Sequence, residues 1–485
     1  MRPKVKYLSD ELIQQIISEA REILCKLGVE IHNDTILAML ADNGAKVDKT
    51  KKHVLFTNEL IDKALKIVTG PFKLYDVHGN ETNDFSGDNV YFTPGSSGLH
   101  ILDPETRDVK KPVTEDYIKY AKVVSQLKNI ASQSTAFVLT DIHEDISDSY
   151  RMFLGLLHCE KPIVTGTFKA ESFEVMKNFL VAIRGSEDKL KEKPLSIFSA
   201  CPTSPLKWSD ITSQNVLDCA KYSIPVEFIA MPMAGFISPV TLTGTLVAHT
   251  AETLSGIVFS QLANPGTPIL YGGSPGIFDV RYETTPMGAV ETMMIDCAFN
   301  EIGKYLGIPT QAYTSMGDSK HVDAQAGLES AMGATMAALA GINNVSGPGM
   351  IDFENCISLD KLVIDNEICG MVLRMVKGIE PKEDFPALPH FEELLKEKHL
   401  LISKHSRKYL REEHYFPGQV IDRANRSRWQ EEGSRDIHMR SADEIEKLLN
   451  NYQPSSLSDD VKNELISLME SEAKKHGQDK LPERN

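Results

Sequence analysis

The sequence predicts an α/β fold in which eight strands and eight helices alternate as a (βα)8, or TIM, barrel. Eight strand-like segments recur at intervals of 31 to 42 residues, and each is followed by a helix-like stretch. Most have a near-continuous apolar core, which is typical of parallel strands buried on both faces. The segments are VYFTPGSS from Val90, IASQSTAF from Ile130, PIVTGTF from Pro162, LSIFSAC from Leu195, VEFIAMPM from Val226, PILYGGS from Pro268, TQAYTSM from Thr310 and NNVSGPGM from Asn343.

Several of these segments end in Gly, Ser, Thr or Pro, residues suited to a chain that leaves a sheet beside a ligand. In this fold the functional groups lie on the loops that follow the strands. Within the repeats, Ser238–Pro239 and Thr285–Pro286 each predict the start of a helix, because a capping hydroxyl precedes a proline suited to the first turn. The search for function is thereby reduced to eight short loops.

The repeats divide the chain into three parts. Residues 1–85 precede them and are predicted to form a helical cap, with one amphipathic helix between Ser9 and Gly28 and a second after Thr57. Residues 86–380 hold the barrel. Residues 381–485 are charged, helix-prone and dilute in apolar positions, which predicts a helical extension that wraps the barrel or makes the contact of a homo-oligomer.

Composition excludes several classes of protein. The chain has 485 residues, 41% hydrophobic and 25% charged, with a net charge of −16, as an ordinary globular protein does. Its acidic balance argues against nucleic acid and anionic membranes as partners. No apolar run approaches the ~20 residues of a spanning helix. No signal peptide is visible, and seven scattered cysteines without a C-x-x-C pair predict a reduced cytoplasmic protein.

Five segments in the second half carry a family resemblance. They are CPTSPL at 201–206, MAGFISPVTLTG at 233–244, PGTPILYGG at 265–273, GDSKHVDAQAG at 317–327 and DNE at 365–367. Together they resemble the trimethylamine methyltransferase family of corrinoid-dependent methyltransferases, and the likeness extends from about residue 10 to residue 380. The D-S-K-x-x-D-A-Q-A-G block is its most specific part.

The resemblance implies a (βα)8 enzyme that moves a methyl group from an amine to the cobalt of a separate, cognate corrinoid protein. One branch of the family carries pyrrolysine near the loop after the seventh strand. This chain has only standard residues there, Gly317 to His321. It therefore resembles the branch without pyrrolysine, whose members demethylate quaternary amines such as glycine betaine.

A quaternary amine fits the residues because its nitrogen already carries a positive charge and leaves as a neutral amine. No general base is then required, and no residue is assigned a catalytic role; the protein has to bind the cation, align one N–CH3 bond and exclude water. Three hypotheses follow: transfer from a quaternary amine such as glycine betaine or a related betaine, transfer from a tertiary amine or another methyl donor, and a non-catalytic barrel that binds a cation.

Aromatic faces are the expected partners of a quaternary nitrogen, which has no N–H to donate. Aromatic residues at or just beyond strand ends are Phe92, Tyr271, Tyr313 and Phe353, with Phe137 and Phe168 as further candidates. A betaine carboxylate would also need a donor, for which Lys320, His321 or Arg281 could serve. Each aromatic residue could instead serve only to pack the barrel. Each of the three cationic residues could instead be an ordinary solvent-exposed side chain.

The corrinoid is expected to come from the partner protein. On the strand-end loops, Gly95, Asp318 and Gln325 are expected to face it. Corrinoid domains that bind cobalt through histidine use D-x-H-x-x-G, and three segments begin that pattern without its closing glycine: Asp76–Val77–His78, Asp141–Ile142–His143 and Asp436–Ile437–His438. A separate corrinoid domain would also need on the order of a hundred further residues.

A metal site in the chain itself is not expected. His249 and Glu252 lie one turn apart on a predicted helix, a spacing that a metal could use, but no third ligand is evident. Cys201 ends the fourth strand and could be a nucleophile or a thiolate ligand, although a buried structural cysteine is the more common reading.

Overall fold

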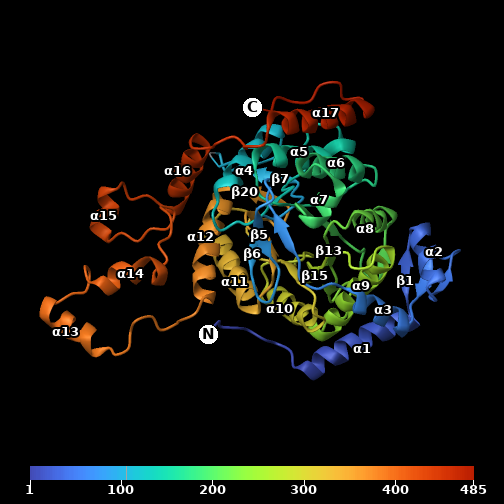
Figure 1. The fold of residues 1–485 in the computed structure, drawn as a ribbon, viewed down its shortest axis with the longest axis horizontal. Helices are drawn as coiled ribbons and strands as arrows, with labels where there is room; N and C mark the ends of the chain where they lie inside the picture. Colours follow the sequence, from blue (N-terminus) through green and yellow to red (C-terminus); the bar gives the residue numbers. More distant parts are fainter. Residues whose placement is uncertain (105, 485) are drawn as a thin grey trace.

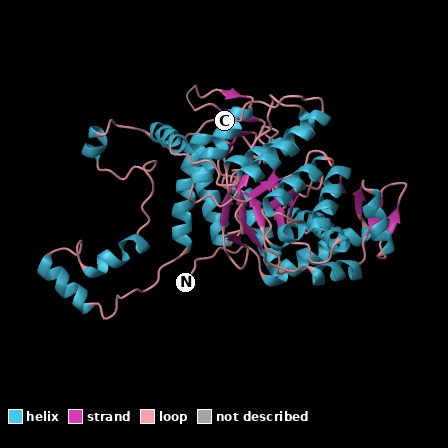
Figure 2. Cartoon of the chain, turned by 45° about the horizontal axis from the view of Figure 1, so that its top comes forward, coloured by secondary structure: helices cyan, strands magenta, loops and turns pink. Residues whose placement is uncertain are grey.

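A computed structural model, which describes residues 1–104 and 106–484, shows an α/β fold with parallel strands at its centre and helices around them (Figures 1 and 2). Each of the eight predicted segments contains one central strand. These strands are β6 (Tyr91–Thr93), β9 (Gln133–Ser134), β10 (Ile163–Thr165), β11 (Ser196–Ala200), β13 (Val226–Ala230), β15 (Ile269–Gly273), β17 (Gln311–Tyr313) and β18 (Asn344–Ser346).

The central strands form two parallel sheets. One has the order β15-β13-β11-β10-β9 and the other the order β17-β18-β6. A parallel bridge between Tyr271 and Thr310 joins β15 to β17. At the other side, the Ala131 amide just before β9 donates to the Phe92 carbonyl of β6 over 2.8 Å. Both seams between the sheets therefore carry backbone hydrogen bonds.

The inner side of the strands is filled near their amino ends by a separate apolar cluster. It joins Val164, Ile197 and Leu270 of three strands with Leu74 and Phe85. The last two residues come from the hairpin of β4 (Lys73–Tyr75) and β5 (Glu81–Asp84) and the residue that follows it. Because successive side chains of a strand point to opposite faces, this cluster fixes which strand residues face inward and which face the helices.

Helices follow the strands in the order expected of strand–helix repeats. They are α4 (Thr114–Gln126), α5 (Ser147–His158), α6 (Ser172–Arg184), α8 (Asp210–Tyr222), α9 (Leu242–Ala263), α10 (Val290–Tyr305), α11 (Ala324–Ala340) and α12 (Leu359–Val376), with the short α7 (Glu187–Glu192) and a 3-10 turn (Glu144–Ile146) between them.

The predicted starts of two of these helices were a few residues too early. The N-cap of α9 is Thr241, whose hydroxyl accepts from the Gly244 amide over 3.3 Å, and α10 begins after Ala289. Ser238 instead shares a 3.0 Å hydrogen bond with the Thr245 hydroxyl. The hydroxyl that sequence reasoning took for a cap shapes the loop before the helix.

The amino-terminal region contains strands as well as the predicted helices. The helices are α1 (Asp10–Lys26), α2 (Asp34–Asp42) and α3 (Asn58–Ile67), and the Ser9 hydroxyl caps α1 as predicted. Strands β1 (Val29–Ile31), β2 (Lys46–Asp48) and β3 (His53–Leu55) form a sheet with β12 (Lys207–Trp208), in the order β12-β1-β3-β2. Because β12 follows β11, this sheet ties the cap to the central strands.

Small sheets also build the loops at the carboxyl ends of the central strands. One has the order β19-β20-β7-β8, from β19 (Met350–Ile351), β20 (Cys356–Ser358), β7 (His100–Leu102) and β8 (Val109–Lys110). The other pairs β14 (Met233–Ala234) with β16 (Gly276–Ile277), beyond β13 and β15. These sheets give the strand-end loops a defined shape.

The carboxyl-terminal extension has two parts. Helices α16 (Ile437–Asn450) and α17 (Asp459–Lys475) lie against the body, where Gln126 donates to the Leu448 carbonyl over 2.7 Å. In the preceding segment, residues 379–436, the helices α13 (Leu388–Glu397), α14 (Lys404–Glu413) and α15 (Arg426–Glu431) extend away from the body (Figures 1 and 2). Between α14 and α15 this segment returns to α12, where the Gly418 amide donates to Glu367 over 2.8 Å. We call it the arm; none of its three helices buries a residue. Among the described residues, no helix is long and apolar enough to cross a membrane.

Candidate functional site

A cavity of about 330 Å³ lies at the carboxyl ends of the central strands. Its walls come from β11, β13, β17 and the loops after β6, β10, β11, β13 and β15, together with the β19–β20 hairpin and α8. The lining residues are Ser96, Ser97, Gly166, Thr167, Phe168, Ser199, Cys201, Thr212, Asn215, Ile229, Met231, Ser274, Tyr313 and Glu354. This is the position at which a parallel α/β fold binds its ligand.

A buried carboxylate, Glu227, stands in β13 beside this cavity. Its side chain is 0% exposed, and it accepts hydrogen bonds from the Ser199 hydroxyl over 2.7 Å and from Asn344 Nδ2 over 3.1 Å. The Thr93 hydroxyl holds the other end of the Asn344 amide, 2.9 Å from Oδ1. Burial raises the pKa of Glu227 to about 7, against the opposing effect of the two donors.

A second carboxylate, Glu354, reaches the cavity from the β19–β20 hairpin. Asp352, Phe353 and Glu354 are consecutive residues with φ of 54°, 56° and 72°, a left-handed turn that residues with a Cβ adopt at a cost. Among the described residues, none donates a hydrogen bond to the Glu354 carboxylate. Burial raises its pKa to about 8.

The two carboxylates both act on the pKa values of Tyr313 and Cys201. Burial raises the pKa of the Tyr313 phenol well above its usual value, and the charges of Glu227, Glu354 and Cys201 act in the same direction. Cys201 is exposed toward the cavity, yet the protein packed around its thiol raises the pKa to about 12, with added repulsion from the two carboxylates. At neutral pH both groups are therefore uncharged, and Cys201 is a thiol rather than a thiolate nucleophile.

Phe168 forms another part of the wall and is 43% exposed. The guanidinium of Arg151 lies 4.7 Å from the centre of its ring. Arg151 is itself buried and donates from Nη1 to the Thr135 carbonyl over 2.7 Å and from Nε to the Ser147 carbonyl over 3.1 Å. Two backbone carbonyls thus hold Arg151 in α5, with its guanidinium against the ring of Phe168.

The cavity carries negative charge only when its carboxyl groups are ionised, because burial raises the pKa of Glu354 to about 8 and that of Glu227 to about 7. Its lining contains no Lys, Arg or His, one carboxylate from Glu354, two aromatic rings and several neutral hydroxyl or amide groups. Glu227 adds a second carboxylate behind Ser199. Such a cavity can hold a small organic cation, through carboxylate charge and the faces of the rings.

The structure separates the aromatic residues that the sequence suggested. Tyr313 lines the cavity, and Phe353 lies in the hairpin that carries Glu354. Tyr271 does not reach the cavity: Leu270 belongs to the inner cluster, so Tyr271 points to the helices, where its hydroxyl lies 2.9 Å from Thr250. Phe92 and Phe137 are fully buried in the main core.

The candidate partners of a betaine carboxylate also lie outside the cavity lining. The Lys320 amine is over the Phe353 ring, 3.7 Å from its centre, and donates to the Asp318 carbonyl over 2.7 Å. His321 is exposed on the same loop. Arg281 is 75% exposed and pairs with Asp279 over 2.6 Å.

The residues expected to face the corrinoid are spread over the strand-end loops. Asp318 accepts from the Met287 and Gly288 amides over 2.8 and 2.9 Å, and burial raises its pKa to about 6. Gln325 is exposed and donates to Glu329 over 2.8 Å. Gly95 packs so closely on Met350 that a Cβ would overlap that side chain. Asp318 therefore orders its own loop, and Gly95 permits a close contact.

The residues considered as metal ligands each have protein partners. His249 Nε2 lies 3.0 Å from the Gly272 carbonyl, and burial lowers the pKa of its imidazole to about 3. Glu252 accepts from the Ser204 hydroxyl over 2.7 Å and from the Leu206 amide over 2.9 Å. In the part of the chain that the structure describes, no three His, Cys, Asp or Glu side chains form a group that could hold a metal.

Sequence reasoning missed the two glutamates and Ser199. Glu227 carried a signal, because it is the only charged residue in the otherwise apolar segment VEFIAMPM. Glu354 carried none, because it lies eleven residues after the start of the eighth segment in an unremarkable polar turn.

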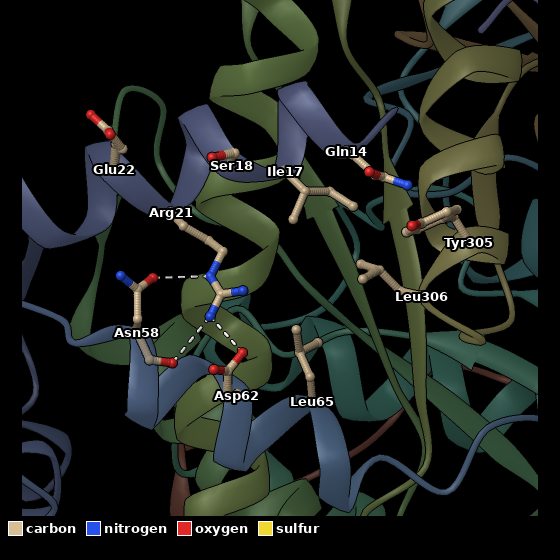
Figure 3. Close-up of a pocket in the computed structure, with 10 residues that line it drawn as sticks. All are labelled: Gln14, Ile17, Ser18, Arg21, Glu22, Asn58, Asp62, Leu65, Tyr305 and Leu306. Carbon is tan, nitrogen blue, oxygen red and sulfur yellow. Dashed lines mark hydrogen bonds and ion pairs between the residues drawn. The ribbon is translucent and has the colours of Figure 1, made fainter. Parts of the chain in front are cut away.

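A second cavity, of about 580 Å³, lies between α1, α3 and the end of α10 (Figure 3). Arg21 crosses it and donates to Asn58 Oδ1 over 3.1 Å and to Asp62 over 2.5 Å. Tyr305, at its edge, ends α10 just before β17 begins, so this cavity is at the amino end of the strands. Its main charges satisfy each other, and it has no link to the carboxylates described above.

A cavity at the carboxyl ends of the parallel strands of an α/β fold is typical of an enzyme. Comparison with known proteins is more specific. The chain matches the trimethylamine methyltransferase (MTTB) family over residues 1–477 and belongs to that family. It is a methyltransferase.

Similar relatives have two different names. The chain is 29% identical to a trimethylamine methyltransferase MttB of Desulfitobacterium hafniense, with 97% of this chain and 94% of the relative covered. It is 28% identical to a glycine betaine methyltransferase of Desulfitobacterium hafniense strain Y51, with 98% and 99% covered. A crystal structure of the Methanosarcina barkeri monomethylamine methyltransferase MtmB has a TM-score of 0.53 at 13% identity and covers 99% of this chain and 90% of that one, which shows a shared fold.

Proposed function

We propose that this protein transfers a methyl group from a quaternary amine to Co(I) of a cognate corrinoid protein. The observation that carries the proposal is the cavity, whose lining contains Glu354 and the rings of Tyr313 and Phe168 and no cationic side chain, with Glu227 buried behind Ser199. Relatives named for trimethylamine and for glycine betaine support a methylated amine as the donor.

We also infer that the eight central strands close into a (βα)8 barrel. Both seams between the two parallel sheets carry backbone hydrogen bonds, and the strand order then runs β6-β9-β10-β11-β13-β15-β17-β18 and back to β6. In such a barrel the inner apolar cluster closes the amino end, and the cavity opens at the carboxyl end.

The side chains of the cavity stabilise and orient the cation rather than move protons. A carboxylate about 4–5 Å from the ammonium contributes roughly 3–4 kcal/mol at an effective dielectric constant of about 20. The rings of Tyr313 and Phe168 can add about 0.5–2 kcal/mol each through cation–π contact. A quaternary nitrogen leaves as a neutral amine, so neither glutamate has to act as an acid.

The corrinoid supplies a Co(I) nucleophile when its carrier protein meets the cavity. A cavity of about 330 Å³ is too small for a corrinoid ring, so the carrier has to approach the open end. Large apolar side chains are exposed on the loops there and at the start of α10, as a docking surface requires: Leu99, Phe168, Met231, Phe236, Val240, Val280, Tyr282 and Val290. All seven cysteines are free thiols, which supports the cytoplasm as the compartment.

The test is methylation of free cobalamin. The protein is incubated with chemically reduced Co(I) cobalamin and one of several amines, and formation of methyl-Co(III) is followed by absorbance. We expect methyl-Co(III) from a quaternary amine and not from trimethylamine. Glu227→Gln should reduce the rate at least tenfold, whereas Glu392→Gln on the exposed face of α13 should not change it.

Two outcomes would replace the proposal with its alternatives. Methylation by trimethylamine alone would make the protein a tertiary-amine methyltransferase. Tight binding of a quaternary amine in calorimetry, without methyl-Co(III) under any condition, would make it a binding protein for cations.

A further inference from the structure

The distribution of charge around the cavity bears on what is attached to the ammonium group of the substrate. A betaine carries a carboxylate a few ångströms from its nitrogen, and a site for such a molecule needs a positive partner for it. The lining offers Glu354 and no Lys, Arg or His. When the ammonium group of a betaine favours the ionised form of Glu354, the betaine carboxylate shares the cavity with that negative charge and finds no positive side chain in the lining.

The cations on the surrounding loops are held elsewhere. Lys320 donates to the Asp318 carbonyl and lies over Phe353, and Arg281 forms its ion pair with Asp279 while 75% exposed. Arg151 lies behind the ring of Phe168, with Nε and Nη1 on backbone carbonyls. None of the three lines the cavity.

Neutral hydrogen-bonding groups, in contrast, are abundant in the walls. Hydroxyl groups come from the loops after β6 and β10, from β11 and from α8, and an amide comes from Asn215, which donates to the Ser199 carbonyl over 3.0 Å. The hydroxyl-bearing residues are Ser96, Ser97, Thr167, Ser199, Thr212 and Ser274. Hydroxyls both donate and accept, so they can pair with an uncharged polar group on a ligand.

Glu354 is placed to receive the cation itself. None of the described residues donates a hydrogen bond to its carboxylate, although the hairpin that carries it is firmly held: the Asp352 amide donates to the Ser319 carbonyl over 2.9 Å, and the Leu99 amide to the Asn355 carbonyl over 2.8 Å. An acceptor that the protein presents without a donor gains its partner from a ligand.

We propose that the substrate is a quaternary ammonium compound with an uncharged, hydroxyl-bearing tail, of the choline type, rather than a carboxylated betaine. This inference rests on the proposed methyl transfer and narrows its substrate. Glu354 pairs with the ammonium group, and the Ser and Thr hydroxyls of the wall pair with the tail. Glu354 thereby discriminates against donors that carry a carboxylate.

The experiment compares choline, glycine betaine and tetramethylammonium by calorimetric binding to the full-length protein and by methyl-Co(III) formation with Co(I) cobalamin. We expect choline to bind at least tenfold more tightly than glycine betaine and more tightly than tetramethylammonium, which lacks the tail. In Glu354→Gln the ratio of choline to glycine betaine affinity should fall at least tenfold. Glu392→Gln is the matched control and should keep the wild-type ratio.

Glycine betaine that binds as tightly as choline to the wild-type protein would overturn the inference and would point to Arg151 as the partner of its carboxylate. An unchanged ratio in Glu354→Gln would overturn it as well. Either result would leave the proposed methyl transfer standing, provided that choline or glycine betaine yields methyl-Co(III). If no quaternary amine yields methyl-Co(III), the proposed function itself is refuted. The wild-type binding comparison stands even if the variant does not fold.

Discussion

Glu354 is a carboxylate whose ionised form the empty protein disfavours. Burial raises its pKa to about 8, and that of Glu227 to about 7, so both carboxyl groups are partly protonated near neutral pH. A bound cation reverses the balance, because an adjacent positive charge favours the ionised carboxylate. Binding of a cation is therefore coupled to release of protons.

This coupling predicts how affinity depends on pH. Below about pH 8 an ammonium ligand has to displace a proton from Glu354, so its affinity should rise with pH, by up to about tenfold per unit for each proton released, and level off above pH 8. The other titratable groups that act on this site, Tyr313 and Cys201, have raised pKa values and stay neutral over this range. Calorimetry of choline between pH 6 and 9 measures the slope.

The neutral isostere 3,3-dimethyl-1-butanol is the control for that slope. It has the shape of choline without its charge, so its affinity should not rise with pH. Glu354→Gln should flatten the choline profile above pH 7 and leave the contribution of Glu227 at lower pH. Equal slopes for choline and the isostere would show that the carboxylates do not contact the cation.

Two tyrosines that look alike in sequence should respond differently to substitution. Tyr313→Leu removes a ring from the cavity wall and should weaken binding of a quaternary amine by about 0.5–2 kcal/mol. Tyr271→Phe removes the hydrogen bond to Thr250 in the helix layer and should lower the free energy of unfolding by about 1 kcal/mol without changing affinity. Calorimetry and thermal unfolding of both variants distinguish the roles; reversed effects would mean that Tyr271 faces the ligand.

The sequence could predict that both tyrosines lie in strands, but it could not predict which face of the sheet each one occupies. Both residues lie in predicted strands, and the sequence places both near strand ends. Which face each occupies depends on register, and a shift of one residue exchanges the inner and outer faces. Because Leu270 packs in the inner cluster, its neighbour Tyr271 must face the helices. Leu270 makes this packing with the β4–β5 hairpin, which lies almost 200 residues earlier in the chain.

At the scale of elements, the carboxyl end of β18 depends on a glycine. Gly347 has φ of 158°, and a Cβ there would overlap the Thr314 carbonyl oxygen of the neighbouring strand loop. Gly347→Ala has to displace backbone and should lower the free energy of unfolding by more than about 2 kcal/mol. It should also weaken amine binding, because the displaced backbone adjoins Tyr313. Thermal unfolding measures the loss.

Gly327 in α11 is the matched control for that substitution. Nothing lies within 4 Å of a Cβ added there, and its backbone is helical. Gly327→Ala should therefore stabilise the protein by roughly 0.5–1 kcal/mol and leave binding unchanged. A Gly347→Ala protein as stable as the wild type would show that the β17 and β18 loops can separate freely.

Elements were predictable where local signals and packing agreed. All eight central strands lie within the predicted segments, because apolar runs of that length have few alternatives in a folded chain. The hairpin that carries Glu354 was not predictable, since its left-handed residues are fixed by contacts with Ser319 and Leu99 rather than by Gly or Asn in the turn. The strands of the cap were missed for the same reason: β1 pairs with β12, far away in sequence.

At the scale of the whole molecule, the arm contacts the body between α14 and α15 but leaves the apolar side chains of α13 and of the segment before it uncovered. Its apolar side chains are largely exposed, including Phe385 at 80%, Leu388 at 67% and Phe391 at 59%. Several large apolar side chains exposed within a few residues of one another often mark an interface. The sequence suggested a homo-oligomer contact for this region, and the extended position of the arm in Figures 1 and 2 favours it over wrapping of its own body.

We therefore expect the protein to form a homo-oligomer through the arm. Leu388, Phe391 and Leu395 recur at the spacing of one helix face on α13, so Phe391→Glu combined with Leu395→Glu places two charges in the proposed interface. Light scattering should give a multiple of 53.9 kDa for the wild type and a lower mass for the double variant. Glu393→Gln, an exposed change on the same helix, should keep the wild-type mass. Circular dichroism should be the same for all three proteins, because α13 buries no residue in its own chain.

A monomeric wild type at the same concentrations would contradict this prediction and would assign the apolar face of the arm to another protein. The corrinoid carrier would be the first candidate, tested by mixing it with the wild type and with the double variant.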